Sequence, residues 1–84
     1  MKQRDQKIVR AILEALDLAD GLLIETILHA EVNLRVTPNT LLSEFEKGVN
    51  FCESKRWITG VRPDVGSTKW MITDYGRANK AEMQ

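Results

Sequence analysis

The sequence predicts an α+β fold in which three amphipathic helices are followed by a β-hairpin and a short C-terminal helix. Three successive segments carry apolar residues at helical spacing. After them, two short runs of alternating apolar and polar residues flank a turn rich in Pro, Gly, Ser and Asp, which is typical of a hairpin. Because the chain has 84 residues and no linker-like stretch, we expect residues 1–84 to form a single domain.

The first helix is expected to run from about Gln3 to Leu18 and to stop at Asp20-Gly21, since Gly commonly follows a helix end. Its apolar residues form two neighbouring stripes. Val9 and Leu13 make the second stripe, which either enters the core or packs against a second copy of the chain as a homodimer interface. The first stripe faces the core and consists of Ile8, Ile12, Ala15, Leu16 and Ala19.

The second helix is expected from Leu22 to about Val32, and Val36 could pair with the hairpin as a third strand. The third helix ends near Lys55. Its start has three alternative caps, which are Thr37, Thr40 and Ser43. Thr37 would place Pro38 at the first helical position, which suits Pro, and Ser43 with Glu46 fits a capping box. The core-facing residues of the third helix are expected to be Leu41, Phe45, Val49 and Cys52, with Gly48 allowing a close helix–helix approach.

The opposite face of the third helix carries short polar side chains that suit close contact with base edges in a major groove. Helical spacing places Thr40, Ser43, Lys47, Asn50 and Ser54 on this outward stripe. Three carboxylates flank the stripe, and these would repel phosphate groups. They are Glu44, Glu46 and Glu53.

The hairpin strands are expected at 57–61 and 69–72, joined by the loop from Arg62 to Thr68. In this loop Pro presets φ, Asp bonds the backbone and Gly66 takes positive φ. Arg62 and Lys69 stand on either side of the loop, and Ser67 and Thr68 add hydroxyl donors. A protruding loop of this composition can lie along a sugar-phosphate backbone. The last helix is expected at 74–82, capped by Thr73-Asp74, with Gly76 permitting close packing of its first turn.

Three segments together resemble the winged helix-turn-helix superfamily, in particular small bacterial or phage regulator-like domains. They are the helix end Glu53–Ile58, the loop region Gly60–Lys69 and the closing segment Trp70–Arg77. The closing segment is similar to the "strand, then Thr-Asp-x-Gly-Arg" ending common in multiple-antibiotic-resistance-type regulators. The resemblance implies a winged helix-turn-helix fold in which the third helix is the recognition helix and the hairpin is the wing.

Double-stranded DNA is therefore the expected partner, and a transcriptional regulator or accessory factor is the expected function. The net charge is zero, although residues 55–84 carry a basic excess where phosphate contacts are expected. The alternative is the same fold serving as a protein–protein interaction adaptor, as the neutral charge and the three glutamates suggest. The expected DNA-contacting residues are Arg35, Thr40, Ser43, Lys47, Asn50, Lys55, Arg56, Arg62, Ser67, Thr68 and Lys69.

An enzyme is not expected, and neither is a metal or another cofactor. The single His29 and the single Cys52 cannot close a metal site, which needs about four ligands, and no Gly-rich phosphate loop is present. One cysteine also excludes an internal disulfide and fits a reducing compartment. The polar first residues lack a signal peptide's apolar block, and no apolar run approaches the ~20 residues of a membrane span. We therefore expect a cytoplasmic protein that does not enter membranes.

Overall fold

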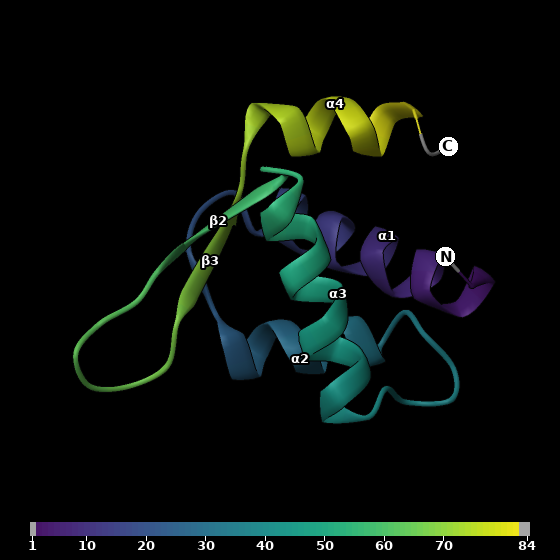
Figure 1. Ribbon diagram of the computed structural model, residues 1–84, viewed down its shortest axis with the longest axis horizontal. Helices are drawn as coiled ribbons and strands as arrows, with labels where there is room; N and C mark the ends of the chain where they lie inside the picture. Colours follow the sequence, from purple (N-terminus) through teal and green to yellow (C-terminus); the bar gives the residue numbers. More distant parts are fainter. Residues whose placement is uncertain (1, 83–84) are drawn as a thin grey trace.

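The computed structural model describes residues 2–82, which form helices and a small antiparallel sheet around one core (Figure 1). It confirms the α+β class and the predicted order of three helices, a hairpin and a last helix. The elements are α1 (Gln3–Ala19), β1 (Leu23–Ile24), α2 (Glu25–Asn33), α3 (Leu42–Ser54), β2 (Ile58–Val61), β3 (Lys69–Ile72) and α4 (Asp74–Glu82).

The sheet has the strand order β1-β3-β2, so the second hairpin strand is its centre. In the register of the sheet, Trp70 lies opposite Leu23 on one side and Gly60 on the other. The indole covers Gly60 so closely that a Cβ there would lie 2.7 Å from Trp70 Cζ3. The sequence suggested Val36 as a third strand, but the third strand is β1. The Val36 N–H instead donates to the Val32 carbonyl at 3.0 Å, which continues the end of α2.

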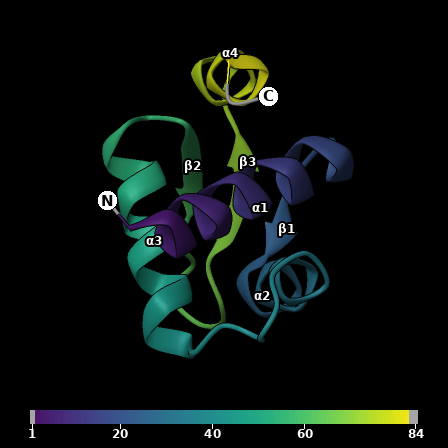
Figure 2. The ribbon, with the colours of Figure 1, turned by 90° about the vertical axis from the view of Figure 1, so that its right-hand side faces the viewer.

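Helix α1 is the centre of the molecule, with α3 on one side, α2 on the other and α4 across the top (Figure 2). Its Ile12, Leu13 and Leu16 are 0% exposed. Val9 and Leu13, which could have formed a homodimer interface, are 2% and 0% exposed. The interface alternative is therefore wrong for these two residues, because a helix packed on several sides buries both apolar stripes.

Gly48 is the point at which α3 approaches α1 most closely. A Cβ on Gly48 would lie 3.0 Å from Ile8 Cγ2 and 3.1 Å from Ile12 Cδ1. This confirms the predicted close helix–helix approach, and Phe45, Val49 and Cys52 enter the core as expected. Leu41 does not, because it precedes the helix and is 68% exposed.

The helix ends differ from prediction in their capping residues. Asp20, and not Gly21, takes the left-handed conformation after α1, with φ 51°. Helix α3 starts after Leu41, whose N–H donates to Glu44 Oε1 at 2.9 Å, so none of the three predicted caps is used. After α3, Arg56 has φ 62° and the Trp57 N–H donates to the Cys52 carbonyl at 3.0 Å, as in a Schellman motif.

Helix α4 starts as predicted, with Thr73 as its cap. Thr73 Oγ1 accepts from the Gly76 N–H at 3.1 Å and donates to the Arg56 carbonyl at 2.6 Å. These two bonds tie the start of α4 to the end of α3. Toward α1, Lys80 and then Arg77 lower the pKa of Asp17, because each cation lies 3.2 Å from a carboxylate oxygen.

Gly76→Ala should destabilise the fold by roughly 1–3 kcal/mol, because the new Cβ would overlap the Trp57 carbonyl oxygen, a backbone atom that cannot move aside. Gly21→Ala is the matched control, since it meets nothing within 4 Å and Gly21 has no positive φ. It should be neutral or stabilising by up to about 1 kcal/mol. Urea unfolding measures both, and equal stability of the two variants would contradict the packing described for Gly76.

Candidate nucleic-acid interface

The exposed face of α3 carries most of the polar stripe that the sequence predicted. Ser43, Lys47, Asn50 and Ser54 are all exposed. Glu46 is exposed beside them and has no ion-pair partner among residues 2–82. This stripe is therefore close to electrically neutral, with one cation and one anion, and it presents mainly hydroxyl and amide groups.

Thr40 does not belong to this stripe, because it is only 7% exposed. Its N–H and its hydroxyl both donate to Asn33 Oδ1, each at 2.8 Å. His29 Nε2 lies 2.8 Å from the same hydroxyl. Since the Thr40 hydroxyl has a single hydrogen and gives it to Asn33, the ring nitrogen of His29 is the donor.

The Thr40 network fixes the connection between α2 and α3. His29 also stacks on Phe45, with ring centroids 4.4 Å apart and an interplanar angle of 12°. His29 therefore holds the α2–α3 connection through its hydrogen bond to Thr40 and its stacking on Phe45. The role of Asn33 was missed, because nothing in the sequence links it to a residue seven positions later.

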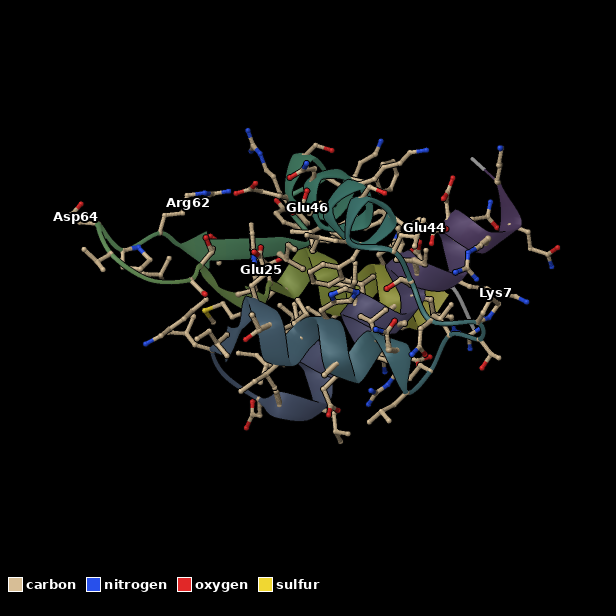
Figure 3. All side chains as sticks on the ribbon, turned by 90° about the horizontal axis from the view of Figure 1, so that it is seen from below. Lys7, Glu25, Glu44, Glu46, Arg62 and Asp64 are labelled. Atoms are coloured by element: carbon tan, nitrogen blue, oxygen red, sulfur yellow. The ribbon has the colours of Figure 1, made fainter. Side chains whose placement is uncertain are left out.

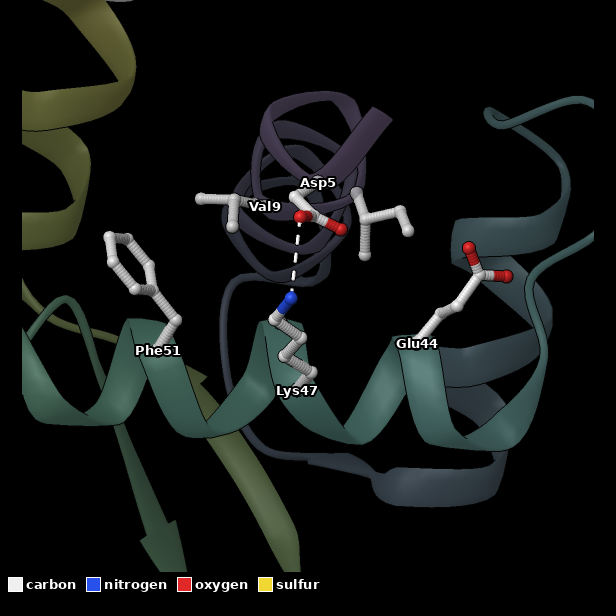
Figure 4. Close-up of a pocket in the computed structure, with 7 residues that line it drawn as sticks. Asp5, Val9, Glu44, Lys47 and Phe51 are labelled. Atoms are coloured by element: carbon white, nitrogen blue, oxygen red, sulfur yellow. Dashed lines mark hydrogen bonds and ion pairs between the residues drawn. The ribbon is translucent and has the colours of Figure 1, made fainter. Parts of the chain in front are cut away.

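Lys47 leans from α3 toward α1, where its Nζ lies 3.5 Å from Asp5 Oδ2 (Figure 4). The pair spans the mouth of a cavity of about 60 Å³ that Ile8, Val9 and Phe51 also line. Because the Lys47 side chain is 73% exposed, this ion pair is weak and the ammonium group can reach an external anion.

Glu44 is bound to α1 by Arg4 and does not face outward as a free charge. Arg4 Nε donates to Glu44 Oε2 at 2.8 Å, and Arg4 Nη2 donates to Oε1 at 3.2 Å. Arg4 Nη2 also donates to the Pro38 carbonyl at 3.0 Å. The Arg4 bonds, together with the Leu41 N–H, lower the pKa of Glu44 to about 2. No local sequence pattern indicates this pair, which joins residues 40 positions apart.

Glu53 is paired on the other flank of α3, toward the hairpin. Arg62 Nη2 donates to both Glu53 oxygens at 2.8 Å, and the Arg62 guanidinium carbon lies 5.1 Å from the Trp70 ring centroid. Arg62 therefore connects the base of the hairpin loop to α3. Figure 3 shows Arg62 and Asp64 at the hairpin end of the molecule and Glu46 on α3.

The hairpin loop extends beyond the body of the protein (Figure 1). Gly66 has φ 101°, as the turn chemistry predicted. Ser67 and Thr68 are half-buried, and the Thr68 carbonyl accepts from the Glu25 N–H at 2.9 Å. Lys69 is exposed at the start of β3. The loop therefore holds a cation at each end and a hydroxyl pair close to the body of the protein.

The remaining cations divide into two groups. Lys55 and Arg56 are exposed at the end of α3, where Lys55 Nζ lies 5.6 Å from the Phe51 ring centroid. Arg35 is separated from them. Its Nη1 donates to the Glu31 carbonyl at 2.7 Å, and its Nε lies 4.0 Å from Glu14, on the face of α1 that points away from α3.

Residues 2–82 include one thiol, that of the buried Cys52. Burial raises the pKa of the Cys52 thiol to about 12, so it is not a nucleophile at neutral pH. No group of three or more His, Cys, Asp or Glu residues is placed to hold a metal ion in this part of the chain. Over the same residues, no helix has both the length and the apolar character needed to cross a bilayer.

The Arg4–Glu44 pair predicts a specific acid sensitivity. The folded-state pKa of the Glu44 carboxyl, about 2, lies below its ordinary value of 4.5. Ionised Glu44 therefore stabilises the fold above pH 4.5, and this contribution is lost as the pH falls toward 2. Glu44→Gln should therefore unfold at lower urea than wild type at pH 6 and match it near pH 2. Glu46→Gln is the control, and a pH-independent deficit in Glu44→Gln would contradict the assignment.

Comparison of the chain with protein-family models, with curated proteins and with solved structures gave no match. The geometry above is therefore the basis for the function proposed next.

Proposed function

We propose that this chain is a winged-helix DNA-binding domain that serves as a transcriptional regulator or accessory factor. Helix α3 lies in the major groove and the hairpin acts as the wing on the sugar-phosphate backbone. One observation carries the proposal: the projecting loop is held beside the exposed face of α3 by the Arg62–Glu53 bond of 2.8 Å. A helix with an adjacent protruding loop can contact a groove and the neighbouring backbone at once.

The exposed side chains divide into two roles under this proposal. Ser43, Lys47 and Asn50 on α3 reach base edges or nearby phosphates, since all three are exposed. Thr40 is removed from the contact set, because it is buried and holds the α2–α3 connection. Arg35 is removed as well, because it lies on the α1–α2 side. The backbone contacts come from Lys55, Arg56, Arg62, Ser67, Thr68 and Lys69.

Ion pairing within the fold reduces the objection raised by the acidic residues of α3. Of the three glutamates, Glu44 is neutralised by Arg4 and Glu53 by Arg62, which leaves Glu46 as the carboxylate facing a duplex. The net charge is still zero. Because non-specific affinity comes mainly from phosphate neutralisation, we expect micromolar binding to random duplex at low salt and much weaker binding at moderate salt.

The double variant Arg62→Ala/Lys69→Ala should reduce the dependence of log K on log salt by up to about two units. Lys69 neutralises one phosphate, and Arg62 neutralises a second where it exchanges Glu53 for the DNA backbone. Fluorescence anisotropy of a labelled random duplex at several salt concentrations measures this slope. The control variant is Arg77→Ala/Lys80→Ala, which removes the same charge from α4, at the opposite end of the fold from the loop. An unchanged slope in the Arg62/Lys69 variant would remove the hairpin from the interface.

Glu53→Gln should tighten duplex binding by about two- to fivefold at low salt, because it frees Arg62 to contact a phosphate and removes a nearby negative charge. Glu82→Gln changes the net charge equally at the exposed end of α4 and serves as the control. The same anisotropy titration compares the two. Equal gains in both variants would mean that net charge, and not the release of Arg62, determines the affinity.

The second candidate function is a winged-helix adaptor that binds another protein and not DNA. The neutral charge and the exposed, unpaired Glu46 on the outward face of α3 favour it. The random-duplex titration separates the two candidates. Absence of binding even at low salt supports the adaptor, whereas affinity that falls steeply with salt supports DNA binding.

A further inference from the structure

A groove of about 650 Å³ lies between α1, the end of α3 and α4. Figure 3 shows one of its lining residues, Lys7, at the end of the molecule opposite Arg62 and Asp64. On α3 itself, Phe51 faces the groove while Glu53 faces the hairpin, and residues two apart on a helix point in nearly opposite directions. The groove therefore adjoins the proposed DNA-binding face at Phe51, whose ring centroid lies 5.6 Å from Lys55 Nζ, although Phe51 itself is not among the proposed DNA contacts.

The accessible apolar part of the groove comes from Phe51 and Trp57, because Val9, which also lines it, is only 2% exposed. Phe51 and Trp57 pack edge to face, with ring centroids 5.7 Å apart and an interplanar angle of 73°. Both rings are half-buried against the core and leave part of their surface in the groove. This aromatic pair can accept a large apolar side chain from a partner.

The polar lining of the groove consists of cations and amide groups, and it includes no carboxylate from residues 2–82. Its cations are Lys7 and Arg10, and its amides are Gln3, Gln6 and Asn79. Arg10 forms an ion pair with Glu14, in which Arg10 Nε donates to Glu14 Oε1 at 3.1 Å. Lys7 is exposed and has no ion-pair partner among residues 2–82. In a chain of zero net charge, Lys7 therefore gives this lining one cation without an ion-pair partner among residues 2–82, next to the paired Arg10.

We propose that this groove binds an acidic peptide segment that carries a large apolar side chain. The apolar side chain contacts Phe51 and Trp57, and the carboxylates of the segment pair with Lys7 and Arg10. The amides favour a peptide over a nucleic-acid strand, because a peptide backbone offers both donors and acceptors, whereas a sugar-phosphate backbone offers mainly acceptors. Asn79 Oδ1 is buried without a hydrogen-bond partner in the described part of the chain.

This inference goes beyond the proposed function and does not depend on it, because a duplex on α3 and a peptide in the groove use separate residues. The probe is a fluorescein-labelled synthetic peptide with Leu and Trp set between Asp and Glu residues. Two control peptides replace the acidic residues by their amides, or replace Leu and Trp by Ala. Anisotropy titrations with the full chain should show binding of the probe and at least tenfold weaker binding of both controls.

Two exposed-site variants test the location of the peptide. Lys7→Glu reverses the groove charge, and Gln6→Trp fills the groove without a change of charge, so each should weaken peptide binding at least fivefold. Lys69→Glu is the matched charge control on β3, and it should leave the peptide affinity unchanged while it weakens duplex binding. The two activities are thus tested separately.

Three results would overturn the proposal. They are wild-type peptide affinity in Lys7→Glu, absence of peptide binding at about 1 mM, and loss of duplex binding in Lys7→Glu without any peptide binding. The last result would assign the groove to nucleic acid.

Discussion

The close packing of α3 on α1 at Gly48 is the constraint on which the rest of the structure depends. Ile8 and Ile12 fill the space that a side chain on Gly48 would occupy. This contact sets the helix spacing, and the spacing lets Arg4 reach Glu44 and Lys47 reach Asp5. Because α1 also contacts α2, α4 and β3, its two apolar stripes are both buried and no free apolar face remains at Val9 or Leu13.

Polar contacts then fix the elements that the apolar core only brings together. Thr40 and Asn33 hold the connection between α2 and α3, Thr73 joins the start of α4 to the end of α3, and Arg62 joins the hairpin to α3. These bonds lie at loops and helix ends, where backbone groups would otherwise lack partners. They orient the outer face of α3 and the hairpin relative to each other, and the proposed function requires that arrangement.

The zero net charge of this small protein conceals local differences in charge between its surfaces. Arg4 and Arg62 neutralise two of the glutamates on α3, so the face proposed for DNA is less acidic than its composition suggests. Beside Phe51, Lys7 and Arg10 line a groove that has no carboxylate from residues 2–82 in its lining. The same helix thus separates two surfaces of different chemistry, one proposed for a nucleic acid and one for an acidic peptide.

The sequence by itself determined the α+β class, the approximate helix and hairpin positions, the Thr73 cap and the glycine contacts at Gly48 and Gly76. These features depend on periodicity and on residue chemistry within a few positions. The predicted start of the second helix was wrong, because Leu23–Ile24, expected in that helix, form β1 and α2 begins at Glu25. Only the tertiary structure decided that β1 pairs with β3, that Val9 and Thr40 are buried and that Leu41 is exposed. It alone also decided which glutamates are paired, because Arg4–Glu44 and Arg62–Glu53 join separate elements, and no local pattern encodes contacts between side chains on separate elements.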